Sequence, residues 1–257
     1  MIGWKKIVFT VIVLIVAGAL VFLIWDIMHR DPPGADVITE SDANWIRNGQ
    51  EYSYRSHQEL VLFLGVGDSA EGKNDKLEYL TLIAVDDIRH TYSVLTVDPD
   101  TCVTVNVIDG YGKTHGLPYD GRIAEALTYG GEGFYSARNV GRSLKLLLHG
   151  REIDHFIEIR DDGKKPLFVT DPAAQLEAIL SETGDETDEN GAAVSCVVST
   201  DLKLERIADL WGDLKESTCT GVRTLEGTRE NGMLVLDAAK ADDVICDLYF
   251  EQKIKTD

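Results

Sequence analysis

An uncharged apolar stretch near the start of the sequence constrains the chain more than any other feature. Residues 7–25 contain no charged side chain, and about twenty apolar residues are what a helix needs to cross the hydrocarbon core of a bilayer. Trp4 and Trp25 flank the stretch, and tryptophan is enriched at membrane interfaces. We therefore expect residues 7–25 to form a single transmembrane anchor.

The charges on the two sides of this stretch predict its orientation. Lys5 and Lys6 precede it, whereas Asp26 and Arg30 after it cancel each other. Because positive residues are retained on the cytoplasmic side of a membrane, residues 1–6 should be cytoplasmic. The expected location is the cell membrane, with a single pass and the main domain outside the cytoplasm.

A cleaved signal peptide is the alternative interpretation of the same stretch. Residues 17–19 read Ala-Gly-Ala, which has the small-x-small pattern of a cleavage site after a short apolar run. The apolar stretch continues through residues 20–25, beyond that point. The continuation favours an uncleaved signal-anchor.

The overall charge excludes one class of partner. Asp and Glu number 44 against 25 Lys and Arg, which leaves a formal net charge of −19. A surface of that sign repels phosphate backbones, so the protein is not expected to bind nucleic acid.

Two regions follow the predicted anchor. Residues 26–57 are polar, include Pro32-Pro33-Gly34 and show no sustained period, so we expect an extracytoplasmic spacer. Residues 58–257 alternate short apolar or β-branched runs with segments of helical period, which predicts one layered α/β domain. The predicted strands lie at residues 60–66, 79–85, 92–97, 102–108, 155–159, 166–169 and 194–198, with a strand pair within 221–236. The predicted helices are a pair within 122–149, then 173–180, 204–214 and 238–250.

The four cysteines leave the redox state open. Their even number allows three pairings, and nothing in their spacing selects one. Cys102, Cys196 and Cys246 lie in apolar runs, which favours small buried side chains. A disulfide stays a possible alternative.

Several segments of the domain resemble, in order, the LytR-CpsA-Psr family of cell-envelope proteins. Residues 62–68, Leu-Phe-Leu-Gly-Val-Gly-Asp, resemble the family's first strand, which ends in Gly-x-Asp, although one extra residue precedes the acid. Residues 95–101 are similar to its Pro-Arg-Asp-Thr segment, with Asp-Thr kept and Asp-Pro in place of Pro-Arg. Further similar segments are its second strand at 79–86, its Tyr-Gly-Gly block at 122–131, its helix and strand at 140–159 and its Thr-Leu-x-Gly at 224–227.

The resemblance covers residues 59–251 and implies a fold and a function. Members of the family are membrane-anchored enzymes that move glycopolymers from polyprenyl pyrophosphate carriers to peptidoglycan or other envelope acceptors. It implies a central mixed β-sheet with helices on both faces. It also implies a role in cell-wall biogenesis, with a polyprenyl phosphate lipid and a glycopolymer as partners and transferase as the activity.

Acidic residues at the ends of strands are the candidate metal ligands. Transfer from a pyrophosphate carrier uses carboxylates to hold a divalent metal ion. Asp68 and Asp100 follow the first and third predicted strands, so they can lie at one sheet edge and share Mg²⁺. Asp75 or Glu78 can supply a further acid. The alternative interpretation of Asp68 is an ordinary turn residue at the end of a strand.

Arginines are the candidate phosphate contacts. Arg122 lies in the block that resembles the family, and we expect it to act in catalysis with Asp100. Arg138 and Arg142 lie one turn apart on a predicted helix, a spacing that directs two guanidinium groups to one face for phosphate recognition. The alternative for both helical arginines is a solvated helix face.

Two departures from the family pattern leave the activity open. The arginine before Asp100 is missing, and an acidic stretch at residues 181–191 occupies the region where active members carry an arginine-rich segment. Losing one positioned charge-stabilising donor typically costs about 10²- to 10³-fold in rate. One hypothesis is therefore a weak or altered glycopolymer transferase, and the other is a non-catalytic scaffold or regulatory binding module of the envelope.

Overall fold

The computed structural model describes residues 45–68, 75–105, 118–128, 134–160, 171–182 and 198–253. All of them belong to one compact unit. The predicted cytoplasmic segment, the anchor at 7–25 and the predicted strand at 166–169 lie outside these ranges. Within the described ranges, no helix combines the length and the apolar character that crossing a membrane requires.

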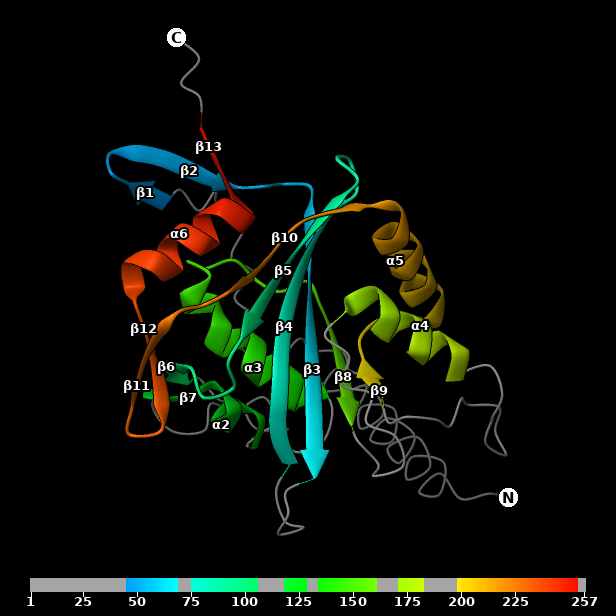
Figure 1. Cartoon of the computed structure of the whole chain (residues 1–257), viewed down its shortest axis with the longest axis horizontal. Coiled ribbons are helices and arrows are strands. Elements are labelled where there is room, and N and C mark those ends of the chain that lie inside the picture. The colour runs from blue at the N-terminus through cyan, green and yellow to red at the C-terminus, as the bar shows by residue number, and fades with distance from the viewer. Residues whose placement is uncertain are drawn as a thin grey trace, which may run out of the picture. The chain divides into compact units, whose positions relative to one another are not determined.

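A six-stranded mixed sheet forms the centre of the domain, with the strand order β10-β5-β4-β3-β8-β9 (Figure 1). β4 is antiparallel to both β3 and β5, whereas β8 runs parallel to β3 and β10 runs parallel to β5. The C-terminal ends of β3, β5, β8 and β10 therefore meet at one edge of the sheet. The strands are β3 (Gln58–Asp68), β4 (Asp75–Asp86), β5 (Thr91–Val97), β8 (His155–Arg160), β9 (Val198–Thr200) and β10 (Thr218–Thr224).

The central strands are buried on both faces. Leu60, Leu62 and Leu64 of β3 belong to one hydrophobic cluster, and Val61 and Phe63 belong to another. Successive side chains of a strand point to opposite faces, so the two clusters are the two sides of the sheet. A strand buried on both faces has a continuous apolar sequence instead of an alternating one, which explains the run at 60–66.

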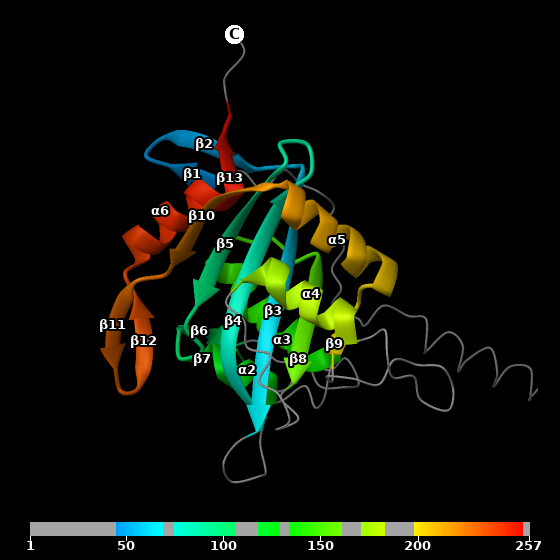
Figure 2. The ribbon, with the colours of Figure 1, turned by 45° about the vertical axis from the view of Figure 1, so that its right-hand side comes forward.

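Helices cover both faces of the sheet, as the turned view shows (Figure 2). The Leu60 face packs against α2 (Ile123–Thr128), α3 (Phe134–Leu147) and α6 (Ala238–Tyr249). The Phe63 face packs against α4 (Pro172–Glu182) and α5 (Leu204–Glu216). The predicted mixed sheet with helices on both faces is confirmed.

The helix α6 shows why the sequence forms a helix at that place. Asp237 is its N-cap, and the Asp237 carboxylate accepts a hydrogen bond from the Lys240 N–H. Its buried residues recur at helical spacing: Ala241, Ile245 and Leu248. This face packs in the same cluster as β3, which fixes the hairpin that precedes α6 close to the edge of the sheet.

Residues 45–54, which lie in the predicted spacer, form two strands of the folded domain. β1 (Trp45–Arg47) pairs with β2 (Gln50–Tyr54), and β2 pairs with β13 (Phe250–Gln252). Trp45 stacks on His149 with ring centroids 4.1 Å apart. The start of the described chain is thereby attached to the end of α3 and to the C-terminal strand.

Two hairpin-like pairs complete the fold beside the sheet. β6 (Cys102–Val105) pairs with β7 (Tyr119–Arg122), and β11 (Gly227–Glu230) pairs with β12 (Met233–Leu236). In the described part of the chain the cysteines Cys102, Cys219 and Cys246 are free thiols, and Cys196 lies outside it.

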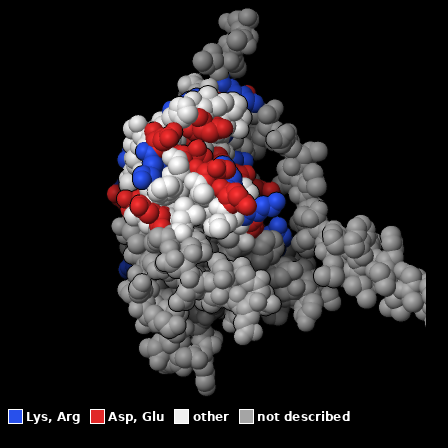
Figure 3. Space-filling view, turned by 90° about the vertical axis from the view of Figure 1, so that its right-hand side faces the viewer, with Lys and Arg blue, Asp and Glu red and all other residues white. Residues whose placement is uncertain are grey.

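Acidic side chains dominate the described part of one face. Figure 3 shows this face, on the side of α4 and α5, with more red carboxylates than blue cations. The exposed residues of α5 include Glu205, Asp209 and Glu216. The excess of acidic over basic residues in the composition is therefore visible on this face of the folded domain.

Candidate functional site

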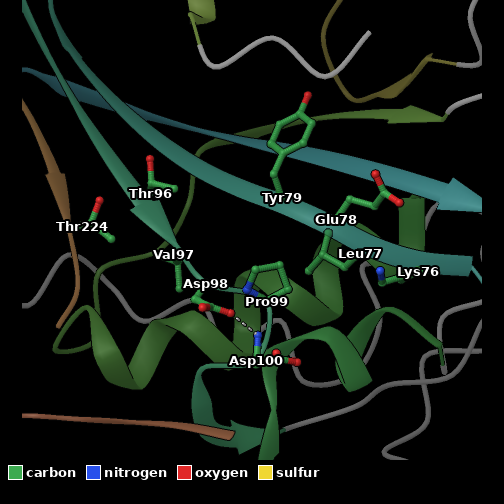
Figure 4. A pocket seen from close by; sticks show the side chains of 10 residues that line it. All are labelled: Lys76, Leu77, Glu78, Tyr79, Thr96, Val97, Asp98, Pro99, Asp100 and Thr224. Atoms are coloured by element: carbon green, nitrogen blue, oxygen red, sulfur yellow. Dashed lines mark hydrogen bonds between the residues drawn. The ribbon is translucent and has the colours of Figure 1, made fainter. Parts of the chain in front are cut away.

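A tight turn follows β5 at the edge where the parallel strands end. The Thr101 N–H donates to the Asp98 carbonyl over 2.9 Å, and the Asp100 N–H donates to the Asp98 carboxylate over 2.8 Å (Figure 4). An aspartate that accepts a backbone N–H two residues ahead stabilises a turn of this kind. We call residues 98–101 the acidic turn.

Two neighbouring segments hold the acidic turn through the backbone. From the start of α2, the Ile123 N–H donates to the Thr101 carbonyl over 2.9 Å and the Ala124 N–H donates to the Pro99 carbonyl over 3.0 Å. From β12, the Leu234 N–H donates to the Asp100 carbonyl over 2.8 Å. Backbone hydrogen bonds from α2 and β12 alone therefore fix the turn on two sides.

Two guanidinium groups approach the carboxylates of the acidic turn. Arg229 of β11 donates from Nη1 to Asp100 Oδ2 over 2.9 Å and from Nη2 to Asp98 Oδ2 over 2.5 Å. Arg122 Nη1 lies 3.9 Å from Asp100 Oδ1. The hydrogen bond to Asp100 and the charge of Asp98 raise the pKa of Arg229. Both arginines are about half exposed, 56% for Arg229 and 49% for Arg122, so their outer faces reach solvent.

Glu125 orients Arg122. The Arg122 Nε donates to Glu125 Oε1 over 3.1 Å, and the Tyr119 hydroxyl donates to Glu125 Oε2 over 3.1 Å. Burial alone would raise the pKa of Glu125, but the hydrogen bonds from Arg122 and Tyr119 lower it overall. Glu125 therefore stays ionised at neutral pH and holds Arg122 beside the acidic turn.

An open pocket of about 580 Å³ adjoins the acidic turn. Asp98 and Asp100 lie at its lower end in Figure 4, beside Pro99, while Tyr79 points away from them. Its walls come from β4, β5 and the end of β10, and they mix apolar and polar side chains: Lys76, Leu77, Glu78, Tyr79, Thr96, Val97 and Thr224. The pocket can hold a ligand that is partly apolar and partly charged.

The structure brings together two of the predicted site residues, Asp100 and Arg122. Asp68 lies at the same sheet edge, at the end of β3, but it pairs with Asp75 whereas Val97 pairs with Leu80. Asp75 and Leu80 are five residues apart on β4, so Asp68 and Val97 are separated by roughly 16 Å along the strand direction at the usual rise of a strand. The side chain of Asp68 is outside the described set, so its proposed role as a metal ligand stays a prediction.

Arg138 and Arg142 lie on α3, as predicted. Arg138 is exposed and Arg142 is half-buried. Burial lowers the pKa of Arg142, and the neighbouring charge of Arg138 lowers it further. The two guanidinium groups are thus close enough to interact, as the one-turn spacing implies. Their role as phosphate contacts stays a prediction.

The residue that sequence reasoning missed is Arg229. Asn231-Gly232 with φ of 50° and 80° is a signal for a two-residue hairpin turn, and it places residue 229 opposite residue 234. Nothing in that local signal places the hairpin against residues 98–101. The contact joins residues 129 and 131 positions apart in the chain, so only the packed fold reveals it.

The carboxylates of the acidic turn do not fit the predicted Mg²⁺ site. Asp98 Oδ1 accepts the Asp100 N–H, Asp98 Oδ2 and Asp100 Oδ2 accept from Arg229, and Asp100 Oδ1 faces Arg122. All four oxygens thus face a donor or a cation. Among the described residues, no group of three His, Cys, Asp or Glu side chains is placed to hold a metal ion. Magnesium stays an untested expectation.

A Gly227→Ala substitution is expected to detach the hairpin that carries Arg229. A Cβ at residue 227 would lie 2.2 Å from the Val235 carbonyl oxygen, which is backbone and cannot turn aside. We expect a loss of about 1–3 kcal/mol in the free energy of unfolding, as overpacking typically costs, with faster hydrogen exchange at residues 228–235. The control is Gly212→Ala, because nothing lies near a Cβ at that helical glycine. Unchanged hairpin exchange in Gly227→Ala would contradict the argument.

The fold defined by this sheet and these helices is that of the LytR-CPS2A-psr proteins. TagT bound to LI-WTA superposes with a TM-score of 0.50 at 13% identity, over 75% of this chain and 90% of that chain. The LytR-CPS2A-psr family protein YwtF (TagT) with bound octaprenyl pyrophosphate lipid gives 0.48 at 13% identity, over 75% and 89%. The transcriptional regulator yvhJ from Bacillus subtilis gives 0.49 at 17% identity, over 75% and 95%. The predicted resemblance is confirmed for the fold.

Two further comparisons gave no match: no protein-family model matches the chain, and no curated protein matches it.

Proposed function

We propose that this chain is a membrane-anchored, extracytoplasmic protein of cell-envelope glycopolymer biogenesis that binds a polyprenyl phosphate or pyrophosphate carrier of a glycopolymer. The observation that carries the proposal is the approach of two guanidinium groups, Arg122 and Arg229, to one turn beside an open pocket.

The chemistry of the site supports an anionic ligand with planar oxygen groups. A guanidinium presents five N–H donors in a fork that matches phosphate oxygens. Asp98 and Asp100 take two of the five N–H groups of Arg229, and the side chain is 56% exposed, so its other N–H groups can reach a ligand. In a chain of net charge −19, Arg122 and Arg229 both bring positive charge to one carboxylate, Asp100, at the acidic turn.

The pocket supports a ligand that also has an apolar part. Its lining includes three apolar residues, Leu77, Val97 and Pro99, beside the charged residues Lys76, Glu78, Asp98 and Asp100. The fold supports the same ligand class, because TagT, which shares it, has been seen bound to LI-WTA. Fold likeness alone does not assign an activity, so the proposal depends on the arginines.

Native mass spectrometry of the full-length protein in mild detergent tests the proposal. Wild type extracted from a bacterial membrane should carry a polyprenyl phosphate or pyrophosphate. Arg122→Gln should carry roughly tenfold less, because a charge-assisted hydrogen bond to phosphate is lost. The control is Arg89→Gln, which removes an equally exposed arginine that contacts Asp86 and Glu251 at the other end of the sheet.

The same measurement separates this proposal from its alternative. Bound lipid in wild type and in Arg89→Gln, but not in Arg122→Gln, supports carrier binding at the acidic turn. Absence of any phosphate lipid from wild type would reject the proposal and favour a scaffold that contacts other envelope proteins.

A further inference from the structure

We propose that Arg229 is the resident cation of the acidic turn, bound to Asp100, which is one of the two acids predicted to hold a divalent metal ion, so that the site takes a phosphate ligand without metal. The identity of the ligand rests on the proposed function, whereas the role of Arg229 rests on the geometry of the turn itself.

Hydrogen-bond donors and cations surround the two carboxylates of the acidic turn. Arg229 bridges Asp98 and Asp100 through two different nitrogens, at 2.5 and 2.9 Å. A fork that contacts one oxygen of each acid holds the two carboxylates together, as a bridging metal ion does. The remaining oxygens face the Asp100 N–H and Arg122.

The two guanidinium groups oppose the binding of a metal ion electrostatically. A divalent cation at these carboxylates would have to displace Arg229 and would still face Arg122, whose Nη1 is 3.9 Å from Asp100 Oδ1. Repulsion between two like charges about 4 Å apart near a surface lowers the binding constant of the metal ion by at least about tenfold. A metal ion is therefore expected to bind wild type weakly, and better once the guanidinium is removed.

Backbone pairing fixes the hairpin strand that carries Arg229 beside the acidic turn. Arg229 lies opposite Leu234 in the hairpin register, and the Leu234 N–H donates to the Asp100 carbonyl over 2.8 Å. Gly227 allows the two hairpin strands to approach each other closely. The strand that carries Arg229 is thus joined to the strand that hydrogen-bonds the acidic turn, which distinguishes this ion pair from a chance contact of two mobile surface side chains.

The metal arm of the test uses Mn²⁺ and electron paramagnetic resonance on the full-length protein without lipid. Arg229→Gln should bind Mn²⁺ at least about tenfold more tightly than wild type. Adding Asp98→Asn to Arg229→Gln should remove the gain, and Arg229→Lys, which keeps the charge, should stay close to wild type. Arg89→Gln is the matched control, because its loss leaves Asp86 and Glu251 uncompensated at the other end of the sheet. Equal Mn²⁺ affinity in wild type and Arg229→Gln, whether high or low, overturns the inference.

The ligand arm uses farnesyl pyrophosphate, measured calorimetrically in EDTA and in Mg²⁺. Wild type should bind with the same affinity in both conditions, within about twofold. Binding that requires Mg²⁺ overturns the inference and leaves the proposed function in place. Absence of binding in both conditions counts against the proposed function, and the Mn²⁺ result alone then decides the role of Arg229.

Discussion

Phe63→Ala is expected to lower the free energy of unfolding by about 3–5 kcal/mol, as truncation of a buried phenylalanine typically does. Phe63 is 0% exposed and lies in the cluster between the sheet and the helices α4 and α5. It pairs with Thr81 of β4 and Ile157 of β8, so strands surround it on both sides and cannot collapse into the space left behind. Urea unfolding of the full-length protein, followed by circular dichroism, measures the change.

The control for this substitution is Ile88→Ala. Ile88 is 61% exposed in the turn between β4 and β5, and its truncation should change the free energy of unfolding by less than about 0.5 kcal/mol. A loss below about 1 kcal/mol in Phe63→Ala would mean that the second face of the sheet is not closely packed. The helices α4 and α5 would then not form the second layer described above.

Much of the fold was predictable from local pattern. The apolar runs at 60–66 and 79–85 are long because β3 and β4 lie in the centre of the sheet with helices on both faces. The helix predicted at 204–214 is α5, which extends to Glu216, and the helix predicted at 238–250 is α6. In both helices the buried residues recur at helical spacing, so the period alone identifies them.

Elements that depend on distant partners were not predictable. The strands β1 and β2 are only three and five residues long, and they are stabilised by β13 near the other end of the chain. Runs this short show no sustained period, so residues 45–54 were predicted as part of a spacer. The turn at Asn48-Gly49, with φ of 50° and 75°, is the one local signal for a hairpin in that region.

The residues of the candidate site also include some that the local sequence predicts and one that it does not. Asp100 was predicted because it follows an apolar strand, β5, and Arg122 was predicted because it lies in the segment that resembles the Tyr-Gly-Gly block of the family. Arg229 was not, because its partners are fixed only when β12 pairs with the acidic turn. A guanidinium can therefore reach a site from a distant part of the sequence, where no local pattern predicts it.

The double substitution Arg122→Gln with Arg229→Gln should weaken farnesyl pyrophosphate binding by roughly 50-fold, more than either single substitution, because each guanidinium donates charge-assisted hydrogen bonds to phosphate. Calorimetric titration of the full-length protein measures the loss, and farnesol, which lacks the phosphates, should bind both proteins alike. Asp98 and Asp100 would then be left without their cations. Repulsion between these carboxylates and the ligand would add to the loss of donors.

The single variants decide whether the two arginines act on one ligand. Arg122 and Arg229 both approach Asp100, from opposite oxygens of its carboxylate. When one arginine is removed, the other is free to turn toward Asp100 and away from the ligand. The affinity lost in each single variant should therefore include part of the contribution of the remaining arginine. The double variant should therefore lose less than the product of the two single losses. If the losses multiply without coupling, the arginines bind separate groups, and if neither single loss exceeds that of Arg89→Gln, the acidic turn is not the phosphate site.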